Sequence, residues 1–344
     1  HAQAQKEEMA KKNIKFIFVG RLISQEKTQQ AAREQIEVEK RGVEFIPLNG
    51  PKLSRVNSWQ KQLTLPFTLC RAVQQAHQII KQQKPDVFLS FGGYLAVPLA
   101  LASWLNRVPI VTHEQTRAPG LASRLIGLLA QKVALTWPKT KSCFPVKKTV
   151  VTSNPVRPEV INENQSPPSW FQTQIEKPIL LIMGGSQGSR PINQVVIQSL
   201  PQLLKSWTVI HLTGQKNQVK TQQPNYYPLE WVTGSDLSWI YTQSKLASSR
   251  AGANTVFELA INLIPTLYIP LPFARHQEQE KNATYFTQKQ AGLLLKQQDL
   301  TSKNLLLALK QLNDNYSQFK TNLQQIKLPV TGAQALLKTV YDAA

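Results

Sequence analysis

Short apolar runs and longer amphipathic stretches alternate along the whole chain. The runs are rich in β-branched and aromatic residues and end in Gly, Pro, Ser or Asn, which predicts strands followed by helices. The predicted strands are residues 15–20, 87–90, 110–113, 133–137 and 150–152 in the first half, and 179–183, 209–213, 246–248, 266–269 and 293–295 in the second. Fully apolar strands joined by helical crossovers indicate parallel sheets that are covered on both faces.

The alternation falls into two groups, which predicts an α/β protein of two doubly wound domains. We assign residues 1–157 to the first domain, residues 158–330 to the second, and residues 331–344 to a C-terminal helix that packs back on the first. Residues 159–177 have little periodicity, so we interpret them as the linker. Sheets of this kind bind ligands at the carboxyl ends of their strands, so we expect the site in a cleft between the domains.

The first residues do not fit a complete doubly wound domain. Residues 2–12 predict the last part of a helix that runs into the strand at residues 15–20. A first strand and a glycine-rich turn should precede that helix, so we expect that the chain starts late. Because the first strand lies in the middle of such a sheet, its absence predicts a gap between the strands at 15–20 and 87–90.

Composition excludes several classes of protein. The chain has 344 residues, of which 42% are hydrophobic and 17% charged, as in globular proteins. No apolar run approaches the roughly 18 residues that cross a bilayer, and the polar N-terminus has no signal-peptide pattern. Cys70 and Cys143 exclude a disulfide framework, and the five histidines lack ligand spacing, so we expect a reducing compartment and no metal.

The net charge narrows the choice of partners. Lys and Arg number 40 against 20 Asp and Glu, which leaves +20. Such a charge attracts nucleic acid, anionic lipid or phosphorylated ligands. The basic residues are scattered and no nucleic-acid-binding motif is present, which argues against nucleic acid. A phosphate-rich ligand and a membrane surface remain open.

A glycine-rich turn follows the predicted strand at residues 179–183. Gly184, Gly185 and Gly188 allow the backbone to approach a ligand closely, Ser186 offers a hydroxyl, and the next helix presents its free amides. A tight turn that simply needs glycine is the alternative, and the density of glycines favours contact with a phosphate or sugar. The pattern is neither the dinucleotide fingerprint nor the P-loop, which argues against a nicotinamide cofactor and an ATPase.

A second turn, at residues 248–258, has the same logic. Gly252 follows a strand, and Asn254 and Thr255 place polar groups at the start of the next helix. Glu258 lies one turn into that helix, where its carboxylate could accept hydrogen bonds from a pair of vicinal hydroxyls. It could equally complete a helix cap, since Glu is favoured in first turns.

The first half holds two comparable strand ends. Gly92, Gly93 and Tyr94 form a glycine turn that opens a helix. His113 and Glu114 end an apolar strand, where burying polar groups requires specific partners. The histidine pattern alone leaves a structural role and a catalytic role equally open.

Residues 56–84 carry apolar side chains interleaved with basic ones. Trp59, Leu63 and Phe67 alternate with Lys61 and Arg71 among others. An apolar stripe with basic flanks suits docking onto anionic headgroups. An amphipathic helix packed on its own sheet explains the same pattern and is favoured by the pattern alone.

These motifs together resemble one family. FGGYLAVP, THEQ with PGLASR, NPVR, GGSQGS, SRAGANTVFE, and PLPFA followed by Gln279 and Asn282 occur in the order and spacing of the MurG family, over nearly the whole chain. That family has the GT-B fold of two Rossmann-like domains. It transfers N-acetylglucosamine from UDP-N-acetylglucosamine to the muramyl 4-hydroxyl of lipid I in peptidoglycan synthesis, with inversion and without a metal or cofactor. The resemblance implies the same reaction, at an anionic membrane surface on the cytoplasmic side.

The resemblance also implies roles for individual residues. Glu258 would hold the ribose hydroxyls, residues 253–255 would meet the phosphates, Val232 would pack against uracil and Gln279 would read the sugar. The implied donor-binding set is Thr116, Arg157, Ser186, Val232, Ala253, Asn254, Thr255, Val256, Phe257, Glu258 and Gln279. His113 and Glu114 are the candidate catalytic pair, and the phosphate and acceptor loops would be Gly92, Gly93, Tyr94, Gly184, Gly185 and Gly188.

Three departures from the family pattern matter. The family's glycine-rich loop, GGTGGH, is not in this sequence, Thr116 stands where the family has Asn, and Glu278 stands where His or Gln precedes Gln279. We therefore expect a chain that binds donor and transfers poorly. The alternatives are a donor-binding remnant without transfer activity and a UDP-N-acetylglucosamine 2-epimerase, which shares the fold but lacks GGSQGS and THEQ.

Overall fold

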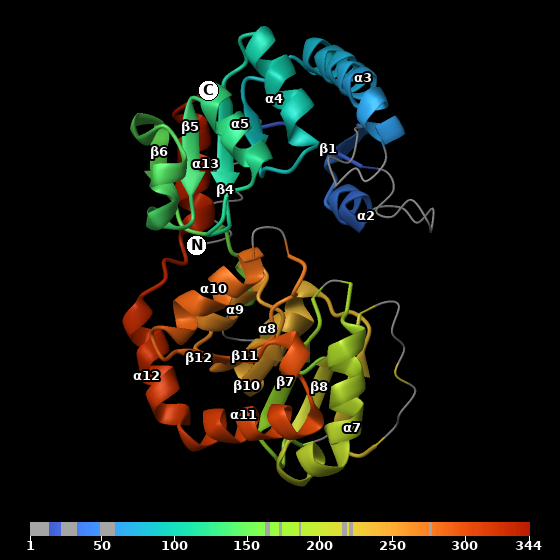
Figure 1. Cartoon of the computed structure of the whole chain (residues 1–344), viewed down its shortest axis with the longest axis vertical. Helices are drawn as coiled ribbons and strands as arrows, with labels where there is room; N and C mark the ends of the chain where they lie inside the picture. The colour runs from blue at the N-terminus through green and yellow to red at the C-terminus, as the bar shows by residue number, and fades with distance from the viewer. Residues whose placement is uncertain are drawn as a thin grey trace.

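The computed structural model consists of two α/β halves stacked end to end (Figure 1). It describes residues 14–21, 33–48, 59–161, 166–171, 174–185, 187–214, 219, 223–274 and 277–344. The side chains of residues 33, 34, 37 and 59–66 are outside the description. The helix predicted at residues 2–12 also lies outside the described residues.

Four parallel strands form the main sheet of the N-terminal half. They run in the order β3 (Phe88–Ser90), β4 (Ile110–Glu114), β5 (Lys132–Leu135) and β6 (Thr149–Val151). The connecting elements are α4 (Ala96–Leu105), α5 (Leu121–Leu129), η1 (Pro138–Cys143) and η2 (Val146–Lys148), and α3 (Trp59–Gln83) packs against α4. The carboxyl end of β4 therefore presents His113 and Glu114.

The remaining strands of this half form a separate sheet. β1 (Ile17–Gly20) and β2 (Glu44–Pro47) pair in parallel, with α2 (Arg33–Lys40) between them in the chain. Among the described residues β1 pairs with β2 and not with β3, and the gap expected from the sequence stays a prediction.

The C-terminal half is built on one six-stranded parallel sheet, ordered β12-β11-β10-β7-β8-β9. Its strands are β7 (Ile179–Met183), β8 (Thr208–Leu212), β9 (Tyr226–Leu229), β10 (Ser244–Ser249), β11 (Thr266–Tyr268) and β12 (Gly292–Leu294). Its helical elements are α7 (Arg190–Ser206), α8 (Gly234–Gln243), α9 (Ala253–Ile261), α10 (Glu278–Thr287), η4 (Gln297–Asp299) and α11 (Ser302–Asp314). The strand order reverses between β7 and β10, the position where open α/β sheets bind ligands.

Both faces of β7 are buried, which explains its unbroken apolar sequence. Ile179 and Leu181 belong to the cluster that includes α8 and α9, whereas Leu180 and Ile182 belong to the cluster on the α7 and α11 side. A strand covered by helices on both faces needs apolar residues at every position.

The chain passes between the halves twice. It crosses after β6 into α6 (Pro158–Ile161), and again between α12 (Tyr316–Ile326) and α13 (Gly332–Tyr341), where Leu336 packs on β4 and β5. The two crossings touch, because a Cβ on Gly332 would lie 2.2 Å from the Asn154 carbonyl oxygen. Only glycine permits that approach.

The segment at residues 159–177 differs from the interpretation as a linker. Phe171 is buried in the core of the C-terminal half, 4.7 Å from Trp239 and 4.9 Å from Tyr227 between ring centroids. Trp170 joins the same aromatic group. The segment is therefore packed against the C-terminal half rather than free between the halves.

Candidate functional site

Helix α9 begins directly at the end of β10. Gly252 is its N-cap with an extended backbone, and the amide of Val256 makes the first helical bond, 3.0 Å to the Gly252 carbonyl. The amides of Ala253, Asn254 and Thr255 precede that bond and have no carbonyl one turn back. The start of α9 therefore carries a partial positive charge toward the carboxyl edge of the sheet.

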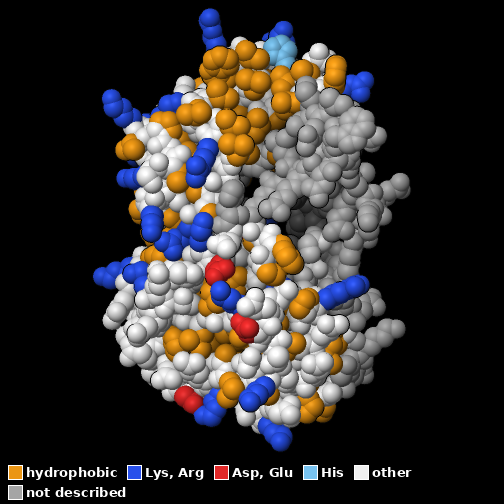
Figure 2. Space-filling view, viewed as in Figure 1, with side chains coloured by type: hydrophobic (Ala, Val, Ile, Leu, Met, Phe, Trp, Pro, Cys, Tyr) orange, Lys and Arg blue, Asp and Glu red, His pale blue; other side chains and the backbone are white. Residues whose placement is uncertain are grey.

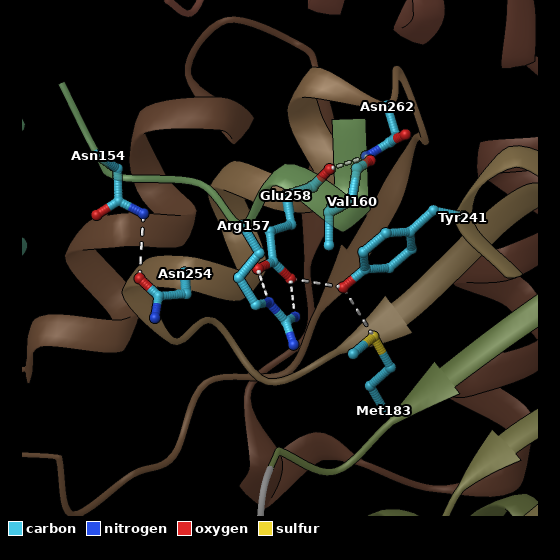
Figure 3. Close-up of polar contacts among 8 residues, drawn as sticks. All are labelled: Asn154, Arg157, Val160, Met183, Tyr241, Asn254, Glu258 and Asn262. Atoms are coloured by element: carbon cyan, nitrogen blue, oxygen red, sulfur yellow. Dashed lines mark hydrogen bonds and ion pairs between the residues drawn. The ribbon is translucent and has the colours of Figure 1, made fainter. Parts of the chain in front are cut away.

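Glu258 lies on the same helix and is fully engaged. Its Oε1 accepts from Arg157 Nε at 3.0 Å, and its Oε2 accepts from Arg157 Nη2 at 2.9 Å and from the Tyr241 hydroxyl at 3.0 Å (Figure 3). The structure thus brings together two residues of the predicted donor set that are 101 positions apart in sequence.

Tyr241 was not predicted as a site residue. It lies on α8 at 1% exposure, next to Trp239 and Ile240, and a tyrosine in such an apolar run indicates packing rather than a site. Burial, and next the negative charge of Glu258, raise the pKa of Tyr241 well above its usual value, so its hydroxyl remains a donor.

Arg250 was also not predicted as a site residue, although it lies inside the SRAGANTVFE motif. Its Nη1 donates to the carbonyls of Ile269 and Pro270, each at 3.0 Å, and its Nη2 donates to Ser189 Oγ at 2.7 Å and to the Gln297 amide oxygen. All four acceptors are neutral, and burial lowers the pKa of Arg250 to about 10. This buried cation adds positive potential behind the glycine-rich turn.

The glycines at that turn divide into two kinds. A Cβ on Gly184 would lie 2.5 Å from the Ser189 amide, and a Cβ on Gly214, which follows β8, would lie 2.3 Å from Gly188 of the turn, so tight packing explains these positions. Gly185, with φ of +83°, has only the Arg250 side chain within reach at 4.0 Å and leaves its surface open. Ser186 lies outside the described residues.

His113 holds one of the crossings between the halves. The ring is 1% exposed, and its Nε2 donates to the Ser153 carbonyl at 3.1 Å. Burial lowers the pKa of His113 to about 4, and the bond to Ser153 opposes that shift, so the ring is neutral near pH 7. Its Nδ1 is then a bare acceptor, without a partner among the described residues.

Glu114 binds within its own loop. Its Oε1 accepts from the Thr116 amide at 2.8 Å and from the Thr116 hydroxyl at 2.7 Å. Both side chains therefore fix the shape of the loop after β4. The catalytic roles of His113 and Glu114, and the donor contact of Thr116, stay predictions.

The glycine turn after β3 lies beside this loop, because β3 and β4 are neighbouring parallel strands. Gly92 and Gly93 have φ of +79° and +85°, and the Gly92 amide donates to Ser90 Oγ at 3.0 Å. The Tyr94 ring lies under the Arg21 guanidinium at 4.6 Å. The Phe91 ring approaches His113 edge-on at 6.0 Å.

The rest of the predicted donor set is placed on the C-terminal half. Gln279 lies in the first turn of α10, where its Oε1 accepts from the Leu271 amide at 3.0 Å. Val232, Val256 and Phe257 are buried in the core cluster, so Val256 and Phe257 reach a ligand only through their backbone. Asn254 is exposed and accepts a bond from Asn154 at 3.1 Å (Figure 3).

An aromatic contact joins the two halves beside α10, and we call it the wedge. Trp137, from the N-terminal half, is 4% exposed and lies 4.6 Å from Tyr285 and 5.7 Å from Phe257 between centroids. The Arg117 guanidinium lies over the rings of Trp137 and Tyr285, at 5.4 and 4.9 Å, and donates to the Lys281 carbonyl at 3.2 Å. The loop after β4 is thereby fastened to α10.

The described residues contain no group of three or more His, Cys, Asp or Glu side chains placed to hold a metal ion. Within the same residues, no helix has the length and apolar character that a bilayer crossing needs.

Comparisons with known proteins match both halves. The Glycosyltransferase family 28 N-terminal domain matches residues 21–135, and the Glycosyltransferase family 28 C-terminal domain matches residues 179–337. The crystal structure of Acinetobacter baumannii MurG superposes with a TM-score of 0.71 over 99% of this chain and 95% of that one, at 21% identity. The predicted GT-B fold class is confirmed by this likeness.

Curated relatives are similar over most of the chain. A Bacillus cereus protein is 34% identical over 296 residues, covering 85% of this chain and 84% of its own. A Clostridium botulinum protein is 34% identical over 295 residues, covering 85% and 83%. Both are named as UDP-N-acetylglucosamine–N-acetylmuramyl-(pentapeptide) pyrophosphoryl-undecaprenol N-acetylglucosamine transferases.

Proposed function

Because the chain belongs to glycosyltransferase family 28, with MurG-type transferases among its relatives, we propose that it moves N-acetylglucosamine from UDP-N-acetylglucosamine to the muramyl 4-hydroxyl of lipid I. The observation in this structure that carries the proposal is helix α9. Free amides at its start and the carboxylate of Glu258 lie on one helix.

The spacing on α9 suits a nucleoside diphosphate. Residues 253–255 lie about one helical turn, roughly 5.4 Å, before Glu258. In a nucleotide, the ribose diol and the phosphate are on opposite sides of one sugar ring, which is a comparable separation. The diphosphate would bind the amides, and Glu258 would accept from the diol. Val232 would pack against the uracil, and Gln279 would bind the hydroxyls of the donor sugar.

The chemistry then follows from charge. The acceptor hydroxyl attacks the anomeric carbon from the face opposite the diphosphate, so one C–O bond forms as the other breaks and the configuration inverts. The hydroxyl proton passes to a base, and the amides at the start of α9 stabilise the negative charge on the departing UDP. Arg250 reinforces that stabilisation electrostatically. His113 and Glu114 stay the predicted pair for this proton transfer. Nδ1 of His113 has no partner among the described residues, whereas Glu114 already binds Thr116.

Because the acceptor is a lipid, the protein must contact a membrane. We propose that the membrane-binding surface lies on the N-terminal half and makes a peripheral contact at the cytoplasmic face. Figure 2 shows hydrophobic side chains gathered over α4 and α5 with Lys and Arg around them. The most exposed are Leu121, Val146, Leu128, Leu105 and Trp104. On α3, Phe67 is 76% exposed, whereas the side chains of Trp59 and Leu63 lie outside the description. An apolar patch within a basic border suits anionic headgroups.

The reaction is tested by mixing the protein with radiolabelled UDP-N-acetylglucosamine and lipid I in vesicles. We expect label in lipid II. Formation of UDP-N-acetylmannosamine instead would establish the epimerase alternative, and donor binding without either product would establish the donor-binding remnant. Either result overturns the proposed transfer.

The membrane contact is tested by sedimentation with vesicles. We expect the protein to pellet with phosphatidylglycerol vesicles and to stay in solution with phosphatidylcholine. Leu121→Asp and Leu128→Asp should release it. Leu307→Asp on α11 is the matched control, because Leu307 is similarly exposed but lies on the other half. Equal pelleting of all variants contradicts this placement.

A further inference from the structure

The carboxylate of Glu258 has little capacity left for a ligand in the structure. A carboxylate offers about four lone-pair sites, and Arg157 and Tyr241 fill three of those on Glu258. Glu258 is only 4% exposed. A vicinal diol that donates two hydrogen bonds therefore requires one of the present partners to leave.

The two partners differ in how they are held. The Arg157 side chain is 42% exposed and lies on a crossing between the halves, so it can turn outward without disturbing a core. Tyr241 is 1% exposed on α8, with its hydroxyl 4.0 Å from the Met183 sulfur. Moving Tyr241 would open the hydrophobic core, whereas moving Arg157 would expose a guanidinium that water solvates well.

We propose that Arg157 occupies the ribose-diol site of Glu258 in the unliganded protein and is exchanged for the donor's diol, while Tyr241 is a positioning residue that holds the carboxylate throughout. This inference rests on the proposed function, because it assumes a ribose at Glu258. The exchange conserves the bonding of a buried carboxylate, since two hydroxyl donors replace two N–H donors. It also frees a guanidinium beside the diphosphate, where its charge is attracted.

Tyr241 is needed for the geometry of the exchange. Its hydroxyl binds one side of Oε2 and so fixes the plane of the carboxylate. The lone pairs that Arg157 vacates are then directed at the incoming diol. Without the hydroxyl, the carboxylate can rotate with the guanidinium and retain it.

The exchange also changes the crossing between the halves. With Arg157 released, the hydrogen bonds left between the crossing and α9 among the described residues are the partly buried Asn154–Asn254 bond at 3.1 Å and a long bond from Asn262 to the Val160 carbonyl at 3.5 Å (Figure 3). Donor binding should therefore raise amide hydrogen exchange at residues 154–160, which most ligands would lower.

The test measures the Kd of UDP and of 2′,3′-dideoxy-UDP by calorimetry. The Kd of 2′,3′-dideoxy-UDP divided by that of UDP gives the contribution of the diol, and we call it the diol ratio. Arg157→Met removes the internal occupant, so the ratio should rise about fivefold or more, even if phosphate affinity falls. Tyr241→Phe keeps the ring and removes the bond, so the ratio should fall by about 3–10-fold.

Two matched controls isolate these effects. Tyr226→Phe also deletes a buried hydroxyl bond, to His211 at 2.9 Å, but lies away from Glu258. Arg124→Met removes the same charge as Arg157→Met, but on α5, where the arginine makes no contact with Glu258. Both should keep the wild-type ratio. An unchanged ratio in Arg157→Met or in Tyr241→Phe overturns the inference, as does a wild-type ratio near 1. A wild type that binds no UDP instead overturns the proposed function itself.

Discussion

Among the described contacts between the two halves, two have opposite chemistry. The wedge buries Trp137 against Phe257 and Tyr285 of the C-terminal half. The second contact is polar, and we call it the clamp: Asn154 binds Asn254 and Arg157 binds Glu258, both from the crossing to α9. The wedge excludes water, whereas the Arg157 side chain in the clamp is 42% exposed.

This difference separates a permanent joint from an exchangeable one. A buried aromatic side chain has no ligand that replaces its contacts, so the wedge persists as long as the halves are folded. The bonds of the clamp are ones that a ligand can make instead. The halves should therefore move about the wedge when the clamp opens.

The largest expected effect comes from breaking the wedge. Trp137→Ala should lower the free energy of unfolding by about 3–5 kcal/mol, because it leaves a cavity in the shared core. Urea unfolding measures the loss. Trp104→Ala is the control, because Trp104 is 54% exposed and its removal should cost far less. Equal losses would mean that Trp137 packs no better than a surface residue.

Lowering the pH should reduce the free energy of unfolding, because His113, which binds the crossing next to the clamp, becomes protonated. The pKa of its ring is about 4 in the folded protein and 6.5 when exposed, so the unfolded state binds the proton more readily between these values. Stability from the neutral ring is complete above about pH 6.5 and is lost as the pH falls toward 4, on the order of 3 kcal/mol in all.

The measurement is the free energy of unfolding from about pH 7 to about pH 4.5. His113→Gln should flatten part of the slope. His211, whose pKa burial also lowers to about 4, is the matched case inside the C-terminal sheet, and it supplies the slope that remains. A slope that His113→Gln leaves unchanged would mean that His113 does not titrate this way.

Within the clamp itself, Glu258→Ala should weaken UDP binding by about 1–3 kcal/mol, because the diol loses a charged acceptor. Calorimetry measures the change, with circular dichroism to verify folding. Glu114→Ala is the comparison, because Glu114 is equally buried but binds only Thr116 in its own loop. We expect it to lower the melting temperature and to reduce UDP affinity less than Glu258→Ala does, because it affects the donor site only through the predicted contact of Thr116. Equal UDP affinity in the wild type and Glu258→Ala would remove Glu258 from the donor site.

The sequence predicted the buried strands well and missed two of the edge strands. The predicted bounds of β7 match the structure, because a strand covered on both faces is apolar throughout. The strands that it missed, β2 and β9, each contain a proline and lie at the edge of a sheet. Proline is tolerated at edges, and an edge strand needs only partial burial, so neither has a strong apolar pattern.

The candidate site was predictable to a similar extent. Strand ends and glycine turns located Glu258 and Gly185, since these depend on local sequence. Tyr241, Arg250 and Trp137 act through partners that are 17 to more than 100 positions away, and their own neighbours in sequence indicate ordinary packing. Such residues are identified only when the fold brings their partners together.

The smallest expected effect tests the polar border of the wedge. Arg117→Lys keeps the positive charge but loses the planar group that lies over both Trp137 and Tyr285. We expect a loss of about 1 kcal/mol in the free energy of unfolding, since cation–π contacts at partly exposed sites contribute about 0.5–1 kcal/mol each. UDP affinity should stay unchanged, because the clamp and α9 are intact. Arg117→Lys therefore separates the two contacts most finely: a loss of UDP affinity without a loss of stability would show that the wedge, and not only the clamp, responds to the donor.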